Sequence, residues 1–233
     1  MIRSLAIIPA RGGSKRIPLK NIKEFYGKPI IAYSIEAAIA SGLFDEVLVS
    51  TDDENVAEIA LRYGASIPFL RSKKNADDHA TISDVVLEVL ENYREANNMP
   101  EIVGCILATA PFLTSKLLHQ GFNKVTKEGF DSSFPIQQFK YPIFRALKFE
   151  ASGLEMFWPE HLNSRSQDLP LAFHDAGQFY FAKTQAFLEG KKFFLKNSFG
   201  IEVSATSAID IDTTEDWEFA EKLYALLRKD KLS

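Results

Sequence analysis

The sequence predicts an α/β fold in which a mainly parallel sheet carries helices on both faces. Short, continuous apolar runs such as 5–10 and 101–109 lack the alternation of a half-exposed strand, so they indicate buried strands. Stretches with apolar residues at helical spacing, such as 29–41 and 82–96, alternate with these runs along the chain. Strands and helices in this alternation are typical of βαβ units.

The first unit opens at the amino terminus. Residues 5–10 are expected to form a strand, and a long loop separates it from a helix at 29–41 that begins with a proline and ends before Gly42. A second strand is expected at 46–51. Asp53 is then placed to cap the helix that follows it.

The pattern continues to about residue 138. A strand is expected at 66–71, and Thr81 with Asp84 three residues later forms an acidic variant of the capping box ahead of the helix at 82–96. The apolar strand 101–109 ends at a proline-containing turn. The helix after that turn is expected to start at Thr114 or Ser115 and to run to about residue 128.

After residue 138 the pattern changes. We expect 139–177 to be an insertion that contains a hairpin around a Ser-Gly turn, within a single domain of residues 1–233. Strands are expected to return at 178–183 and 198–204. An amphipathic helix at 213–229 completes the chain.

Aromatic side chains are concentrated in this expected insertion, and a thin hairpin could not bury all of them locally. A surface between two subunits would explain them, so we expect a homodimer that forms through the insertion. The aromatic residues concerned are Phe139, Tyr141, Phe144, Phe149, Phe157 and Trp158.

Composition narrows the possible partners and compartment. The chain has 27 lysines and arginines against 31 aspartates and glutamates, a net charge of −4, which argues against a nucleic acid partner. No apolar run approaches the roughly 18 residues of a membrane span, and no signal-peptide pattern opens the chain, so the cytoplasm is expected. The single cysteine, Cys105, lies in an apolar run and is expected to be a buried strand residue.

The loop RGGSKRIPLKN at 11–21 is the strongest candidate for a binding site. It follows the first strand, at the sheet edge where open α/β folds bind ligands. Its two glycines would let backbone N–H groups approach phosphate oxygens, and Arg11, Lys15 and Lys20 would balance their charge. It matches neither the P-loop spacing nor the dinucleotide-binding glycine pattern, which argues against an ATPase and a dehydrogenase.

Asp210 and Asp212 are candidates for a metal site. The two residues are two positions apart on a segment that we expect to be extended. Their carboxylates are therefore expected to point the same way, and Ile211 between them is expected to face the core. Two carboxylates with substrate phosphates and waters suit Mg²⁺, although a strand end or a helix cap explains such a pair equally well. The histidines lack zinc-ligand spacing, and no nucleophile motif indicates covalent catalysis.

With IIPARGGSKRIPLKNI at 7–22, the chain resembles the CMP-sugar synthetases, the cytidylyltransferases that activate acidic nine-carbon sugars and their eight-carbon relative. Further segments occur in the family's order, at 49–60, around Arg71, and at 106–114, 163–181 and 209–217. The resemblance implies a Rossmann-like nucleotide-diphospho-sugar transferase fold with an inserted β-hairpin dimerisation arm. It also implies a Mg²⁺-dependent transfer of CMP from CTP to a sugar hydroxyl.

The resemblance also implies roles for particular residues. The catalytic set would be Arg11, Lys15, Lys20, Asp210 and Asp212, with the two aspartates binding the metal. The nucleotide would be bound by Ala10, Arg11, Gly12, Gly13, Asn21 and Arg71, with Arg71 reading cytosine. The sugar would be bound by Arg145, Arg165, Gln167, His174, Asp175 and Gln178.

Within the family, the segment RSQDLP followed by HDAGQFYF is most similar to the members that activate pseudaminate, so the resemblance implies this sugar. Ala108 stands where neuraminate synthetases commonly carry a glutamine, and a site built around that amide would lose a hydrogen bond. N-acetylneuraminate, legionaminate and 3-deoxy-manno-octulosonate remain alternatives. A nucleotide-binding regulatory module and a sugar-phosphate nucleotidyltransferase that uses UTP or GTP also remain open.

Overall fold

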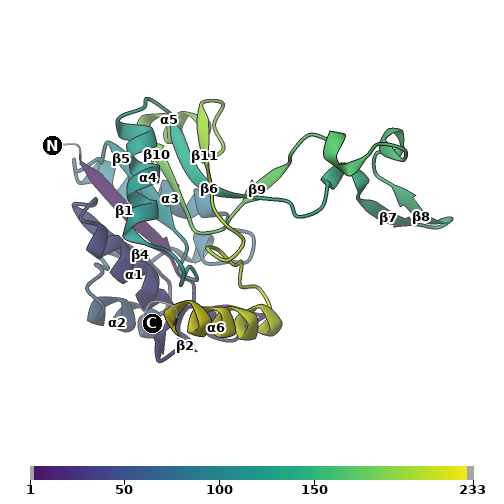
Figure 1. The fold of residues 1–233 in the computed structure, drawn as a ribbon. Helices are drawn as coiled ribbons and strands as arrows, with labels where there is room; N and C mark the ends of the chain where they lie inside the picture. Colours follow the sequence, from purple (N-terminus) through teal and green to yellow (C-terminus); the bar gives the residue numbers. More distant parts are fainter. Residues whose placement is uncertain (1–2, 230–233) are drawn as a thin grey trace.

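A seven-stranded mixed sheet forms the centre of the protein (Figure 1). The computed structural model describes residues 3–229, so residues 1–2 and 230–233 of the expected 1–233 domain lie outside it. The sheet has the order β11-β6-β10-β5-β1-β4, and β9 pairs with the carboxyl end of β6. The strands are β1 (Ser4–Pro9), β4 (Glu46–Ser50), β5 (Ile102–Ile106), β6 (Ser132–Gln138), β9 (Phe173–Asp175), β10 (Phe179–Lys183) and β11 (Ser198–Glu202).

The predicted mainly parallel sheet is confirmed, with two strands reversed: β10 near its middle and the short β9, which pairs antiparallel with β6. Strands β4, β1 and β5 are parallel, and β6 is parallel to β11, whereas β10 runs antiparallel between β5 and β6. The amino end of β10 therefore lies at the same sheet edge as the carboxyl ends of β1 and β5. Segments that enter β10 and segments that leave β1 meet at this edge.

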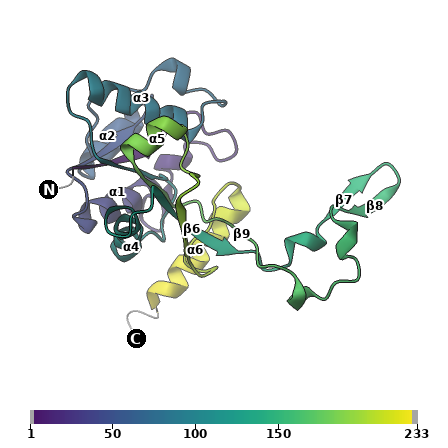
Figure 2. The ribbon, with the colours of Figure 1, turned by 90° about the horizontal axis from the view of Figure 1, so that it is seen from above.

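Helices cover both faces, as predicted (Figure 2). Ala6 and Ile8 of β1 belong to an apolar cluster shared with α1, α2 and α4, while Leu5 and Ile7 belong to a second cluster shared with α3 and α5. Alternate residues of one strand are thus buried on opposite faces. The helices are α1 (Ile30–Ser41), α2 (Glu54–Arg62), α3 (Ile82–Glu95), α4 (Ser115–Thr126), α5 (Thr184–Gly190) and α6 (Thr214–Lys229).

The predicted helix caps are confirmed. The Asp53 carboxylate accepts hydrogen bonds from the first amides of α2, and Thr114 accepts one at the start of α4. Thr81 and Asp84 form the reciprocal bonds of a capping box on α3. These side chains satisfy amides that have no partner inside their helices, so the sequence fixes where α2, α3 and α4 begin.

The C-terminal helix α6 lies against the first loop rather than on either face of the sheet. It packs on the small hairpin β2 (Glu24–Phe25) and β3 (Lys28–Pro29), where Phe25 and Trp217 are buried edge to face. Ile211, just ahead of α6, is fully buried in the same cluster. This third apolar cluster joins residues 17–33 to residues 209–224 and brings Asp210 and Asp212 beside the loop that follows β1.

Residues 139–172, which we call the arm, leave the sheet after β6 and return at β9 (Figures 1 and 2). The arm projects from the body and carries the expected hairpin, with β7 (Leu147–Glu150) and β8 (Gly153–Met156) joined by a turn in which Gly153 has a φ of 123°. Tyr141 is 84% exposed and Phe149 86% exposed. Unlike the arm, 173–175 of the expected insertion pair with β6 in the main sheet.

The strand expected at 66–71 is wrong. A single bridge joins Ser66 to Leu48, and the chain then leaves the sheet because Pro68 has no N–H to donate to a ladder.

Short 3₁₀ helices fill this and other connections, at Lys20–Ile22, Lys73–Asn75, Ile143–Arg145, Pro159–His161 and Ser166–Asp168. The Cys105 thiol is fully buried in β5, as predicted. Over residues 3–229 no helix is both long and apolar enough to cross a membrane.

Candidate active site

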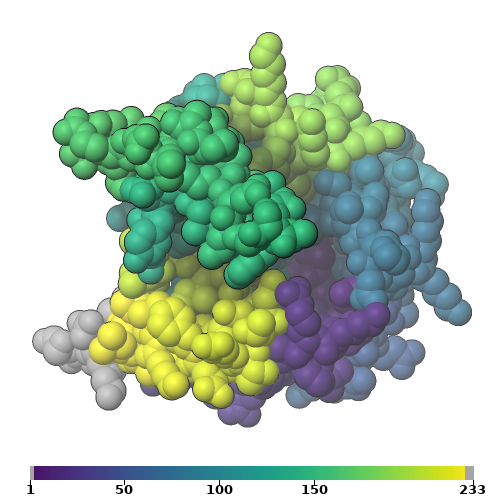
Figure 3. All heavy atoms as spheres, turned by 90° about the vertical axis from the view of Figure 1, so that its right-hand side faces the viewer, coloured from purple at the N-terminus to yellow at the C-terminus, as the bar shows by residue number. Residues whose placement is uncertain are grey.

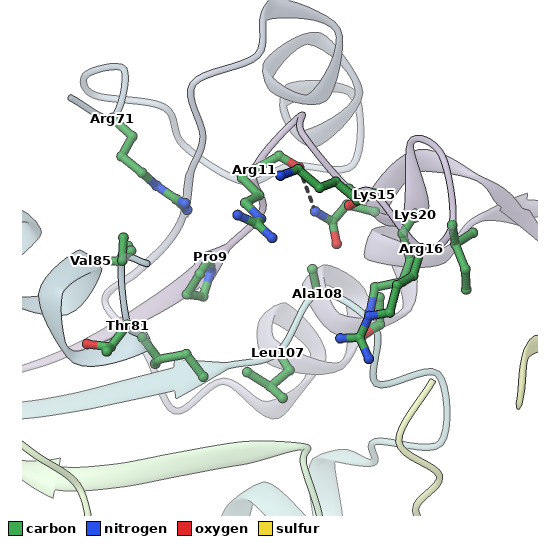
Figure 4. A pocket seen from close by; sticks show the side chains of 16 residues that line it. Pro9, Arg11, Lys15, Arg16, Lys20, Arg71, Thr81, Val85, Leu107 and Ala108 are labelled. Carbon is green, nitrogen blue, oxygen red and sulfur yellow. Dashed lines mark hydrogen bonds between the residues drawn. The ribbon is translucent and has the colours of Figure 1, made fainter. Parts of the chain in front are cut away.

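A pocket lies at the carboxyl ends of β1 and β5, and its lining comes from four segments (Figure 4). They are the loop after β1, the segment at Arg71, the first turn of α3 with Thr81 and Val85, and residues 107–109 after β5. Figure 4 shows Arg11 and Arg71 reaching over the pocket, with Thr81 and Val85 on one side and Arg16 and Lys20 on the other. The fold thus gathers cationic side chains that are far apart in the sequence.

The cations of the first loop are already paired with carboxylates. Arg11 Nη1 lies 2.7 Å from Asp78 Oδ1, and Lys15 also forms an ion pair with Asp78. Asn21 is buried, and its side-chain N–H donates to the Arg11 carbonyl at 2.9 Å, which holds the loop closed on itself. These two cations hold the pKa of Asp78 below its usual range, so Asp78 is a carboxylate in the place where we expect phosphates.

Ala10, Gly12 and Gly13 shape the start of this loop. Ala10 is fully buried and donates its N–H to the Ser50 carbonyl at 2.9 Å. A Cβ on Gly12 would lie 2.5 Å from a carboxylate oxygen of Asp53, the cap of α2, so only glycine fits there. The Gly12 N–H donates to Asp52 at 3.1 Å, whereas Gly13 is exposed with open space around it.

Arg71 is the most deeply buried cation of the pocket. Its Nε donates to Ser50 Oγ at 3.0 Å, and its Nη2 donates to the Ser50 carbonyl. Burial lowers the pKa of this guanidinium, but an arginine starts so far above neutrality that it stays charged. Two bonds to one serine fix the side chain in a single orientation.

Asp210 and Asp212 stand beside the cationic loop but have different partners. Asp212 forms ion pairs with Arg16 at 2.8 Å and Lys20 at 3.4 Å, and Lys20 also donates to the Ile211 carbonyl at 2.7 Å. Among residues 3–229, Asp210 has no hydrogen-bond or ion-pair partner for its carboxylate. Desolvation and the charge of Asp212 raise the pKa of Asp210 above its usual value and outweigh the opposing effect of the nearby Lys20 ammonium.

These two carboxylates fit a shared Mg²⁺ site rather than a closed protein cage. The described residues contain no cluster of three or more His, Cys, Asp or Glu side chains that could hold a metal ion. Mg²⁺ is commonly held by one or two carboxylates together with substrate phosphates and waters. The carboxylate of Asp210, which has no partner among the described residues, is free to act as one such ligand.

The predicted sugar-binding residues fall into two groups. Arg145, Arg165 and Gln167 lie on the arm, outside the lining of the pocket, where Arg165 holds Asp168 at 2.6 Å. His174 and Asp175 lie on β9 at the root of the arm. The structure therefore does not bring the arm residues to the pocket of their own chain.

Gln178 follows this root and is buried at the start of β10. Its side-chain N–H donates to the Ser207 carbonyl at 2.7 Å, while its Oε1 has no hydrogen-bond partner. Tyr180 donates its hydroxyl to the Asp175 carboxylate, and burial followed by this bond raises the pKa of Tyr180. The Tyr180 hydroxyl thus fixes the orientation of the Asp175 carboxylate.

The pocket and both aspartates fall within residues 5–231, which match the family model described as Cytidylyltransferase. The chain belongs to the cytidylyltransferase family. It is 46% identical to the pseudaminic acid cytidylyltransferase of Campylobacter jejuni subsp. jejuni over 96% of this chain and 97% of that protein. It is 32% identical to the CMP-N,N'-diacetyllegionaminic acid synthase of Legionella pneumophila, over 97% of each chain.

A solved structure supports the fold. The CMP:2-keto-3-deoxy-manno-octonic acid synthetase complexed with CTP superposes with a TM-score of 0.70 at 16% identity, covering 96% of this chain and 99% of that one. At this identity the match bears on the fold alone. The nucleotide-diphospho-sugar transferase architecture expected from the sequence is thereby confirmed.

Three features of this cytidylyltransferase site were not among the predicted site residues. Arg16 forms an ion pair with Asp212, the first turn of α3 lines the pocket, and Asp78 forms ion pairs with Arg11 and Lys15. Arg16 could have been found from the sequence, because it belongs to the group of basic residues in the first loop. No local pattern indicates the other two, since the residues they meet are far away in the sequence.

Replacing Asp78 with asparagine is expected to lower the KM for CTP about threefold with little change in kcat. The triphosphate of CTP would then no longer compete with a carboxylate for Arg11 and Lys15, and exposed ion pairs of this kind are weak. Steady-state kinetics at low and high salt measure the KM for CTP of the variant and of wild type. The difference between the two KM values is expected to become smaller at high salt. A higher KM in the variant would contradict the competition and assign Asp78 a supporting role.

Proposed function

We propose that this cytidylyltransferase transfers CMP from CTP to the anomeric hydroxyl of pseudaminic acid, giving CMP-pseudaminic acid and pyrophosphate. The observation that carries the proposal is the cationic pocket at the carboxyl ends of β1 and β5, beside which Asp212 is held by two lining residues, Arg16 and Lys20. Asp210, two residues before Asp212, lies outside the pocket lining and has a carboxylate without a hydrogen-bond or ion-pair partner among the described residues. The near full-length similarity to a pseudaminic acid cytidylyltransferase supports the choice of sugar. The proposal places the enzyme in the cytoplasm, where CTP is available.

CTP would lie along the first loop. Arg11, Lys15 and Lys20 would bind the triphosphate. The exposed backbone of Gly13 would help them, while Ala10 and Gly12 would shape the loop through their N–H bonds to Ser50 and Asp52. The rigid guanidinium of Arg71 would donate to cytosine at the other end of the pocket. Asn21 would act by holding the Arg11 carbonyl and with it the shape of the loop.

The reaction is a displacement at the α-phosphorus. The anomeric oxygen of the sugar forms a bond to this phosphorus while the bond to the bridging oxygen of the β-phosphate breaks, and the hydroxyl proton passes to solvent. Arg11 and Lys20 would stabilise the charge that develops on the departing pyrophosphate. Mg²⁺, held by Asp210 and Asp212, would supply further neutralisation of the phosphates when bound.

We also propose that the enzyme is a homodimer in which the arm of each subunit reaches the other. Its exposed aromatic residues, Tyr141 and Phe149 among them, have no partner within the described residues of one chain. Arg145, Arg165 and Gln167 would then complete the partner's sugar site together with His174 and Asp175. This explains why these arm residues lie outside the pocket of their own chain.

The dimer has a direct test. Light scattering after size exclusion is expected to give twice the mass of the chain, and the double variant Tyr141→Asp, Phe149→Asp is expected to give one chain mass. The double variant Leu61→Asp, Ile39→Asp, which changes exposed apolar residues on the body, is the matched control. A wild-type protein with the mass of one chain would contradict the proposal.

The sugar specificity is tested by pyrophosphate release from CTP and Mg²⁺ with four acidic sugars in parallel. We expect rapid release with pseudaminate and slow release with N-acetylneuraminate, N,N'-diacetyllegionaminate and 3-deoxy-manno-octulosonate. Pyrophosphate release with only one of the other sugars would support the proposed CMP transfer and refute pseudaminate as the substrate. CTP binding without release for any sugar would favour a regulatory module, and competition by UTP or GTP would reveal a different nucleotide.

A further inference from the structure

The loop 203–209, which leads from β11 to Asp210, is held by side-chain amides rather than by secondary structure. Gln137 Nε2 donates to two carbonyls of this loop, that of Ser204 at 2.9 Å and that of Ala208 at 3.0 Å. Gln178 Nε2 donates to the Ser207 carbonyl at 2.7 Å. Gln137 of β6 and Gln178, which directly precedes β10, thus bond to three carbonyls within five residues.

Gln137 is itself rigidly placed. It lies near the end of β6, where its backbone is in register with His174 of β9 on one edge of the strand. On the other edge the preceding residue, Ile136, accepts a hydrogen bond from the Val203 N–H at 2.9 Å. A side chain that grows from a strand paired on both edges has little freedom, so its amide can define the position of the loop it holds.

The hold on Ala208 acts close to Asp210. Ala208 is 3% exposed and Ile211 is fully buried, so the chain is fixed two residues before Asp210 and one residue after it. The Asp210 carboxylate lies over Gly177, where an added Cβ would be 3.9 Å from its carboxyl carbon. The direction of this carboxylate therefore depends on the path of the chain between Ala208 and Ile211.

We propose that Gln137 is a positioning residue for Asp210: by holding the loop 203–209 it fixes the direction in which the Asp210 carboxylate meets the metal. The inference rests on the proposed function only in taking Asp210 as a metal ligand. Without the two N–H donors of Gln137, the Ala208 carbonyl has no hydrogen-bond partner among the described residues. The loop then moves toward water to satisfy it, and Asp210 moves with the loop.

The test is Gln137→Met, which keeps the length of the side chain and removes both donors. Gln138→Met is the matched control, since Gln138 is exposed, follows Gln137 on β6 and makes no side-chain hydrogen bond to residues 3–229. The affinity for CTP is measured twice for each protein, with Mn²⁺ and with EDTA, and no sugar is present. The ratio of the two affinities reports how well the carboxylates meet the metal on the nucleotide.

We expect the ratio of CTP affinity in Mn²⁺ to CTP affinity in EDTA to be about tenfold lower for Gln137→Met than for wild type. Losses of this size are usual when a residue that orients a metal ligand is removed. Its affinity for CTP in EDTA and its Tm are expected to stay close to those of wild type and of Gln138→Met. Hydrogen exchange is expected to rise in peptides that cover 203–210 and not in β1 or β5. If Gln137→Met does not fold, Gln137→Asn, whose shorter amide reaches only one carbonyl, takes its place.

The same ratio for wild type and Gln137→Met would overturn the inference, whether both ratios are large or both are one. A lower affinity in EDTA with an unchanged ratio would also overturn it, because that pattern belongs to a general structural role. The proposed function is tested separately by pyrophosphate release. A wild-type protein that binds Mn²⁺ with CTP but activates no sugar would refute the function while the ratio still decides the role of Gln137.

Discussion

Replacing Asp210 with asparagine is expected to lower kcat about a hundredfold or more while the fold is kept. The variant removes the carboxylate that has no cation partner in the described chain and that we assign to Mg²⁺, and metal neutralisation of phosphates contributes several kcal/mol to such reactions. Asparagine has nearly the same size but carries no charge. Pyrophosphate release at saturating CTP and sugar measures the change.

The stability of this variant has a predicted sign. Desolvation and Asp212 raise the pKa of Asp210, so above that pKa its charge disfavours the folded state. Because Asp210 is exposed, this effect is small, and the neutral amide is expected to leave Tm unchanged or slightly higher at neutral pH. Glu215→Gln, the same chemical change at an exposed position on α6, is the control for both measurements. Wild-type kcat at limiting Mg²⁺, or a clear loss of Tm, would contradict the assignment.

Replacing Lys20 with methionine is expected to lower kcat about a hundredfold and to raise the KM for CTP. Lys20 Nζ reaches the Ile211 carbonyl and Asp212, so it joins the loop after β1 to the segment that carries both aspartates. Loss of one donor to a developing anion commonly costs this much in kcat. Asp212 keeps Arg16 as a partner, so the protein is expected to fold.

The control for Lys20→Met is Lys116→Met, which removes an exposed lysine near the start of α4. Stopped-flow binding of CTP separates the effect on affinity from the effect on the chemical step. Unchanged KM and unchanged kcat would show that Lys20 stabilises the loop without acting on CTP. A loss of Tm as large as that of a variant in the apolar core would show that Lys20 acts mainly in stabilising the fold.

Local patterns in the sequence predicted the elements whose signals are local. The caps at Asp53, Thr81 and Thr114 each depend on residues within three positions, and all three are present. The cationic loop was predicted because it directly follows the first predicted strand. The pair Asp210 and Asp212 was predicted because residues two apart on an extended segment share a face. These features place the site on the fold.

Features that depend on distant residues could not be predicted in this way. The antiparallel direction of β10 follows from its two neighbours in the sheet, and α5 is only seven residues long, too short for a clear helical period. Gln137 looks like an ordinary strand residue, and the carbonyls it holds are 67 and 71 positions away. Asp78 meets Arg11 across a separation of 67 residues.

The pairing of β6 with β9 closes the root of the arm. Ile136 is opposite Asp175, and Gln138 is opposite Phe173, so the two points where the arm leaves and re-enters the body are fixed next to each other by the sheet. A chain inserted between fixed, adjacent ends adds only a slowly growing entropic cost as it lengthens. Residues 139–172 can therefore change in length or sequence without a shift in the register of any strand, so the sugar contacts that we propose for the arm can change independently of the pocket at β1 and β5.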